Sequence, residues 1–162
     1  MFHSKLITVD GLSKVIAILG YRATVVESPA PVPISNIPRR RAAPLPESAP
    51  GYFREAFAAA RKENRPVVLD FWAEWCVPCV LLKEKTLSDP QVAQLLERVQ
   101  LIYVDLDKHP GLGKAYGVQA VPHVFFIDRD GFVVDELRNF EAAESFAVRL
   151  RRLLNESVET GR

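Results

Sequence analysis

The chain has 162 residues, 48% of them hydrophobic and 25% charged, so it has room for one globular domain and an appendage but not for two full-sized domains. Its 21 basic and 20 acidic side chains leave a net charge of +1, which provides no positive electrostatic field for binding nucleic acid. The longest apolar run near the N-terminus, residues 15–19, is far shorter than the roughly 20 residues of a membrane-spanning helix. We therefore expect no nucleic-acid partner and no membrane insertion.

The first residues also lack the pattern of an export signal. Asp10 and Lys14 interrupt the apolar region, and no cleavage site of small residues follows closely. The sequence as written therefore predicts a cytoplasmic protein. A periplasmic location would follow if the true N-terminus differed.

Residues 1–27 predict a short amphipathic helix over 10–20 and a strand over 22–26, too little chain to bury a core alone. This helix and strand resemble the end of a heavy-metal-associated domain, a small ferredoxin-like metal carrier. The metal-binding Cys-x-x-Cys of that family would lie in a front half that is missing here, so we expect no metal. The segment could be a remnant, a docking element or the product of a misassigned start.

Residues 28–50 read as a linker because seven of the chain's 12 prolines fall between Pro29 and Pro50. Proline at this density blocks helical hydrogen bonds and favours extended polyproline II, so we expect a semi-stiff spacer rather than a packed element. The three arginines at 39–41 could touch an anionic surface or form a solvated charge run.

From residue 51 onward the pattern becomes regular and predicts an α/β domain. Helical periodicity and buried strands alternate first, and a hairpin and a long helix follow, which implies a central mixed β-sheet with helices on both faces. We expect residues 157–162 to form a C-terminal tail. The expected helices cover 51–64, a stretch from about 76, 89–98, 112–116 and 141–155, and the expected strands cover 66–72, 101–104, 123–127 and 132–134.

The only two cysteines, Cys76 and Cys79, stand three residues apart at the predicted start of a helix. In one interpretation they form a redox pair. The helix N-terminus would stabilise the Cys76 thiolate for attack, and the less exposed Cys79 would resolve the mixed disulfide, with no cofactor needed. The alternatives are two inert buried thiols, or a zinc site completed by two further ligands, for which the sequence offers the histidines His3, His109 and His123.

Three blocks resemble the thioredoxin superfamily in order and spacing: Asp-Phe-Trp-Ala-Glu-Trp-Cys-Val-Pro-Cys at 70–79, Val-Asp-Leu-Asp at 104–107 and Tyr-Gly-Val-Gln-Ala-Val-Pro at 116–122. The resemblance covers residues 51–156 and implies a thioredoxin fold there. It also implies that Pro122 is the family's cis-proline beside the disulfide. The backbone of Val121 would then pair with an extended substrate segment by strand addition.

Asp70 stands within an apolar strand, where burial should raise its pKa and suit it to taking the proton from Cys79 as that thiol attacks. It could instead be a structural carboxylate bonded to a backbone donor. Tyr103 stands where many thioredoxins have a lysine near this aspartate, and Val80 also replaces a usual lysine. From these departures we expect Asp70 to lack the cationic neighbour that is usual in the family.

The remaining candidate substrate-binding residues surround the cysteines. The resemblance implies that Trp75 covers the edge of the site and that Trp72 packs beneath it, although either could be plain core. Val77 and Pro78, between the cysteines, influence the reduction potential. His123, where thioredoxin has threonine, could tune Cys76, meet the substrate or point outward as a bystander.

Residues 83–92 are similar to the periplasmic C-terminal thioredoxin-like domain of bacterial transmembrane thiol-disulfide reductases. We therefore predict a monomeric bacterial protein-disulfide reductase that uses no cofactor or metal. Its partners would be disulfide-containing proteins and an upstream thiol reductase as electron donor. The alternatives are a disulfide oxidant or isomerase on the same fold, and a non-catalytic docking or metal-handling module.

Overall fold

The structure is a computed structural model, and it describes residues 40–44, 46 and 49–159, with side chains up to residue 155. The helix and strand expected within residues 1–27, most of the expected linker and the last three residues of the tail lie outside this range. None of the helices among the described residues combines the length and apolar character that crossing a bilayer requires.

A mixed five-stranded sheet forms the centre, with strand order β1-β5-β4-β2-β3. Strand β2 runs parallel to β3 and antiparallel to β4, and β5 is antiparallel to both β4 and β1. This is the α/β arrangement that the sequence predicts, with β4 and β5 as the expected hairpin. The strands are β1 (Arg40–Arg41), β2 (Val67–Trp72), β3 (Gln100–Asp105), β4 (His123–Ile127) and β5 (Phe132–Leu137).

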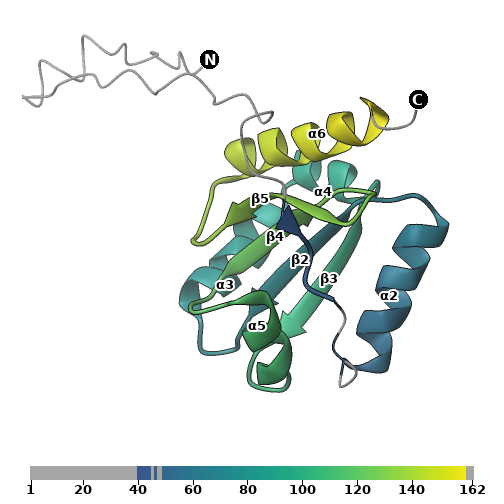
Figure 1. The fold of residues 1–162 in the computed structure, drawn as a ribbon. Helices are drawn as coiled ribbons and strands as arrows, with labels where there is room; N and C mark the ends of the chain where they lie inside the picture. Colours follow the sequence, from purple (N-terminus) through teal and green to yellow (C-terminus); the bar gives the residue numbers. More distant parts are fainter. Residues whose placement is uncertain (1–39, 45, 47–48, 160–162) are drawn as a thin grey trace, which may run out of the picture. The chain divides into compact units, whose positions relative to one another are not determined.

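Helices cover both faces of the sheet, as Figure 1 shows. Capping residues determine where several helices begin or end. Asp89 accepts hydrogen bonds from the first backbone N–H groups of α4, and Gly117 ends α5 in the left-handed conformation at φ 71°. The helices are α2 (Gly51–Lys62), α3 (Val77–Leu81), the π-helix η2 (Leu82–Leu87), α4 (Pro90–Leu96), α5 (Pro110–Tyr116) and α6 (Ala143–Glu159).

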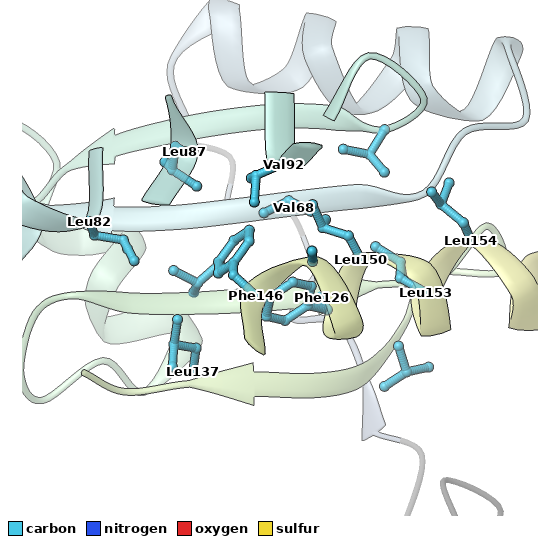
Figure 2. Close-up of a cluster of buried hydrophobic side chains, with 14 residues drawn as sticks. Val68, Leu82, Leu87, Val92, Phe126, Leu137, Phe146, Leu150, Leu153 and Leu154 are labelled. Atoms are coloured by element: carbon cyan, nitrogen blue, oxygen red, sulfur yellow. The ribbon is translucent and has the colours of Figure 1, made fainter. Parts of the chain in front are cut away.

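One core fills the face covered by η2, α4 and α6. Figure 2 shows Phe146, Leu150 and Leu153 of α6 directed at Val68 of β2 and Phe126 of β4, and all five side chains are buried. The alternation of strand residues sends Val68 to this face and its neighbours to the other. The long terminal helix therefore closes the domain by burying its apolar stripe.

The second core lies on the opposite face, under α2 and α5, and it is rich in aromatic rings. Phe53 of α2 and Tyr116 of α5 approach each other edge to face at 6.4 Å between ring centroids, and Tyr116 also packs on Phe71 and Phe125 of the sheet. Such ring pairs stabilise the folded protein beyond the contribution of the surface area they bury. The two cores together hold β2 in a fixed position, and the cysteine segment follows β2 directly.

The expected linker differs from a solvated spacer where the structure describes it. Arg40 and Arg41 form a short strand against Val133 and Phe132 of β5, and Ala49 is buried in the second core. Arg40 and Arg41 therefore add an edge strand to the sheet while their side chains stay exposed. The high proline content of the surrounding segment hid this pairing from sequence analysis. No proline falls at 40–43, so the backbone N–H groups of these residues are free to pair with a strand.

Candidate functional site

Cys76 and Cys79 are joined in a disulfide at the start of α3. Cys76 is the N-cap of this helix, and its sulfur accepts a hydrogen bond from the Cys79 backbone N–H at 3.2 Å. Donors at a helix N-terminus stabilise negative charge, so the same geometry favours a thiolate on Cys76 in the reduced pair. Contrary to the prediction from its place in the sequence, Cys79 is not the less exposed of the two, because Cys76 and Cys79 are both buried, at 3% and 5% exposure.

An apolar rim surrounds the buried disulfide. Ala73, Trp72 and Val121 pack against the two cysteines, while Trp75 and Val77 are exposed by 69% and 68%. The exposure of Trp75 excludes the interpretation that this ring is plain core. Its indole N–H donates to Asp107 Oδ1 at 3.2 Å, which holds the ring at the edge of the site.

The peptide bond between Val121 and Pro122 is cis, as the thioredoxin resemblance implies. Val121 is half-buried and Pro122 is buried, directly before strand β4. Because Val121 packs against the disulfide, the fold brings the downstream Val-Pro motif to the cysteine pair, some 40 residues apart in sequence.

His123 directly follows this loop as the first residue of β4, and its side chain is buried. His123 is 4% exposed. Its ring stacks on Phe125 with 4.2 Å between the ring centroids, and its Nε2 lies 3.2 Å from Glu136 Oε2. Burial lowers the pKa of His123, and the hydrogen bond to Glu136 opposes that effect. The interpretation of His123 as an outward-pointing bystander is therefore wrong.

Glu136 in turn connects His123 to the edge strand. Arg40 and Arg138 donate to its carboxylate at 2.8 and 2.9 Å. Partial burial would raise the pKa of Glu136, but the hydrogen bonds from these arginines and from His123 outweigh it and lower the pKa to about 2. Sequence reasoning did not find this network, because its members come from three separate segments and form no local motif.

Asp70 is the buried carboxylate of the site. It is 4% exposed, and among the described residues none donates a hydrogen bond to its Oδ1. Burial raises the pKa of Asp70 to about 7, and the positive charge of Lys83 opposes the rise. Valine and tyrosine hold the positions of the usual lysines, Val80 and Tyr103, and a cation from η2 acts on Asp70 instead.

Both cysteine sulfurs are occupied by the disulfide, so neither is available to a metal in this state. Within residues 40–44, 46 and 49–159, no group of three or more His, Cys, Asp or Glu side chains is placed to hold a metal ion. The site has the features of a redox pair: a disulfide at a helix N-terminus, an apolar rim and a buried titratable carboxylate.

Fold and site together define a class of α/β proteins that carry a cysteine pair at the N-terminus of the helix after β2, beside a cis-proline loop. The sequence profile of the thioredoxin-like domain family matches residues 53–154. The chain belongs to this family, and it is a relative of thiol-disulfide interchange proteins.

Two sequence relatives show the relationship. The chain is 34% identical over 99 residues to the thiol:disulfide interchange protein DsbD of Neisseria meningitidis, which is 57% of this chain and 16% of that protein. It is 35% identical over 105 residues to DsbD of Ralstonia nicotianae, which is 62% of this chain and 17% of that protein. The chain thus spans less than a fifth of the length of these curated relatives.

Solved structures agree with the sequence relatives. The C-terminal domain of Neisseria meningitidis DsbD in the oxidised form superposes with a TM-score of 0.55 at 32% identity, covering 63% of this chain and 92% of that chain. A thioredoxin from Thermus thermophilus gives a TM-score of 0.60 at 28% identity, covering 68% and 89%. Both matches confirm the thioredoxin fold that the sequence motifs imply.

Proposed function

We propose that this domain is a thiol-disulfide oxidoreductase that reduces disulfides in partner proteins. The observation that carries the proposal is the Cys76–Cys79 disulfide, seated at the N-terminus of α3 and packed against Val121 of the cis-proline loop. The relationship to thiol:disulfide interchange proteins supports a redox role for this pair.

In the proposed reaction the reduced Cys76 thiolate attacks one sulfur of the partner's disulfide. A mixed disulfide forms, and the partner's other sulfur leaves as a thiolate. Cys79 then gives its proton to Asp70, and its sulfur attacks the Cys76 sulfur. The Cys76–Cys79 disulfide forms, the partner's second sulfur leaves and takes up a proton, and the partner has gained two electrons.

Substrate binding would use the surface around the pair. An extended partner segment would lie along the backbone of Val121, and the exposed Trp75 and Val77 would contact its side chains. Main-chain pairing gives affinity without demanding one sequence, so we expect a broad range of protein substrates. An upstream thiol reductase would restore the dithiol, and the domain would act as a monomer.

The two cysteine variants test the proposal. Cys76→Ser should abolish disulfide exchange with a disulfide-bonded peptide, because no attacking sulfur remains. Cys79→Ser should accumulate a mixed disulfide with the peptide, visible by mass spectrometry under non-reducing conditions. Both variants should keep the far-UV circular dichroism spectrum of the reduced wild-type protein. Equal residual exchange in the two variants, or no covalent adduct in Cys79→Ser, would overturn these roles.

A further inference from the structure

Lys83, an exposed lysine of η2, lies near aromatic side chains on the sheet face that contains Asp70. We propose that Lys83 is a positioning residue that keeps the Asp70 carboxylate able to accept the proton of Cys79. The inference deepens the proposed function, since it concerns the resolving step of that exchange. It adds a residue to the site that the similarity to thioredoxins does not locate.

Helix geometry explains how Lys83 reaches this place. Helix α3 continues directly into η2, so residues 77–87 form one helical run. Lys83 follows Cys79 by four residues, which is about one turn, and residues at this spacing share a helix face. Leu82 is fully buried against the core while Lys83 is exposed, so the lysine lies at the rim of the face that packs on the sheet.

Two aromatic rings localise the ammonium group there. Lys83 Nζ lies 5.8 Å from the centroid of the Trp72 ring and 5.9 Å from that of Tyr103. Both rings are within cation–π distance, and such contacts stabilise a lysine at an exposed site by a modest amount. The contacts restrict a side chain that would otherwise be free to move in solvent.

The same two rings border Asp70. Tyr103 is the direct partner of Asp70 in the parallel pairing of β2 and β3, so both side chains leave the sheet on one face. Trp72 follows Asp70 by two residues on β2 and therefore points to that face as well. Lys83 is thus in contact with two rings that share the face of the buried carboxylate, one next along β2 and one opposite on β3.

The charge of Lys83 acts in the direction that the reaction needs. Burial raises the pKa of Asp70, which keeps the carboxyl protonated, and Lys83 partly reverses this effect. A proton acceptor works best when its pKa lies near the working pH. Without Lys83, a larger fraction of Asp70 would already hold a proton at pH 7 when Cys79 has to lose one.

The other groups around Asp70 do not duplicate this charge. Strand β3 presents the neutral phenol of Tyr103, whose pKa is raised by burial and by Asp70, and β4 presents the apolar Val124 opposite Asp70. Cys79 of α3, the proton donor in the proposed reaction, titrates only in the reduced protein. Among the charged side chains described in the structure, Lys83 is the one whose charge lowers the pKa of Asp70.

The oxidised protein gives the most direct test, because its cysteines do not titrate. The Asp70 carboxyl should be followed by carbon-13 NMR against pH in the wild type and in Lys83→Gln, Lys83→Glu and Lys83→Arg. We expect the Asp70 midpoint to rise by about 0.5 pH unit in Lys83→Gln, because an exposed charge is screened by solvent. It should rise further in Lys83→Glu and stay unchanged in Lys83→Arg.

A matched control is Lys85→Gln, which removes an exposed lysine two residues further along η2. It should leave the Asp70 midpoint where it is in the wild type. An unchanged midpoint in Lys83→Gln, or an equal rise in Lys85→Gln, would overturn the inference. The difference between Lys83→Gln and wild type should also shrink as salt is raised from 0.01 M to about 1 M.

The kinetic test uses the pH profile of the resolving step, measured as release of a peptide from its mixed disulfide with Cys76. In Lys83→Gln the profile should move to higher pH by the same amount as the Asp70 midpoint, and in an Asp70→Asn background the substitution should have no effect. If the wild-type protein shows no disulfide exchange, the proposed function is refuted. The NMR titration of the oxidised protein would still test whether Lys83 lowers the Asp70 midpoint. If exchange occurs but the pH profile of the resolving step does not move in Lys83→Gln, only the role of Lys83 is refuted.

Discussion

Strand β2 presents different side chains to the two faces of the sheet. Leu69 and Phe71 point to the face under α2 and α5, where the core is apolar and aromatic. Val68, Asp70 and Trp72 point to the other face, where one carboxylate is buried without a hydrogen bond to its Oδ1 from any described residue. The alternation of a strand therefore separates a face that serves stability from one that also carries chemistry.

The difference between these faces is one of free energy. An aromatic ring in the first face lowers the free energy of the folded state by being buried. A carboxylate in the second face raises it whenever the carboxylate is ionised, because the charge leaves water. Removing a buried ring from the first face and removing the Asp70 charge from the second should consequently change stability in opposite directions, and the following predictions use that contrast.

The largest effect is expected in the aromatic face. Phe53→Ala removes a fully buried ring that packs on Phe57 and Tyr116. It should lower the free energy of unfolding by about 3 to 5 kcal/mol, measured by urea denaturation. Disulfide exchange per folded molecule should stay at the wild-type rate. A loss of exchange in molecules that remain folded would show that the two faces are not separate.

Asp70→Asn should change stability in the opposite direction and in a pH-dependent way. The pKa of Asp70 is raised to about 7 in the folded protein from 3.8 in the unfolded chain, so the folded wild type loses stability as pH rises from about 4 to 7. Above pH 7 the variant should be more stable than wild type by on the order of 2 to 4 kcal/mol.

The control for this prediction is built into the pH range. Below about pH 4 the carboxyl is protonated in both folded and unfolded states, so the difference between Asp70→Asn and wild type should become small and constant. Unfolding curves at pH 3.5, 5.5 and 8 measure it. A stability difference that did not change with pH would contradict the raised pKa.

The same substitution should slow the proposed chemistry. Without a proton acceptor, the resolving attack of Cys79 in Asp70→Asn should be slower by about 100-fold at pH 7, as expected for loss of one acid–base group. Release of a peptide from its mixed disulfide with Cys76 reports this step. The wild-type rate should show an inflection near pH 7 that the variant lacks, and an inflection retained in Asp70→Asn would exclude Asp70 as the acceptor.

The smallest effect is expected at the edge strand. Arg40→Ala removes an ion pair to Glu136 at 2.8 Å in which Arg40 is 49% exposed, and exposed pairs of this kind contribute about 0.5 kcal/mol. Urea unfolding should show a loss below about 1 kcal/mol, with exchange unchanged. A large loss of exchange would instead connect the edge strand to the cysteines through Glu136 and His123.

Sequence alone predicted much of the fold because its signals are local. Nearly continuous apolar runs identified β2 and β4, and the Asp89-Pro90 start identified α4. The short strand β1 was missed, because two residues carry no periodicity and a neighbouring proline-rich composition dominated. The π-helical turn η2 was also missed, since its sequence does not differ from that of an ordinary helix.

The candidate site divides in the same way. Cys76, Cys79 and the cis-proline were found because they lie in compact motifs. The raised pKa of Asp70 was expected from its apolar surroundings, but its cation was not, because Lys83 reaches it through tertiary packing. Spacing offered one usable signal, since Lys83 stands one helical turn beyond Cys79. The burial of His123 depends on Phe125 and Glu136, and no local pattern reveals it.

The reduction potential of the Cys76–Cys79 pair tests the central claim most directly. The protein should be equilibrated in defined thiol-disulfide buffers, with tryptophan fluorescence as the signal and alkylation followed by mass spectrometry as the check. A protein-disulfide reductase should give a midpoint near that of thioredoxin, about −270 mV. A midpoint of about −120 to −180 mV would contradict the reducing direction, and failure to form the intramolecular disulfide would contradict a redox pair altogether.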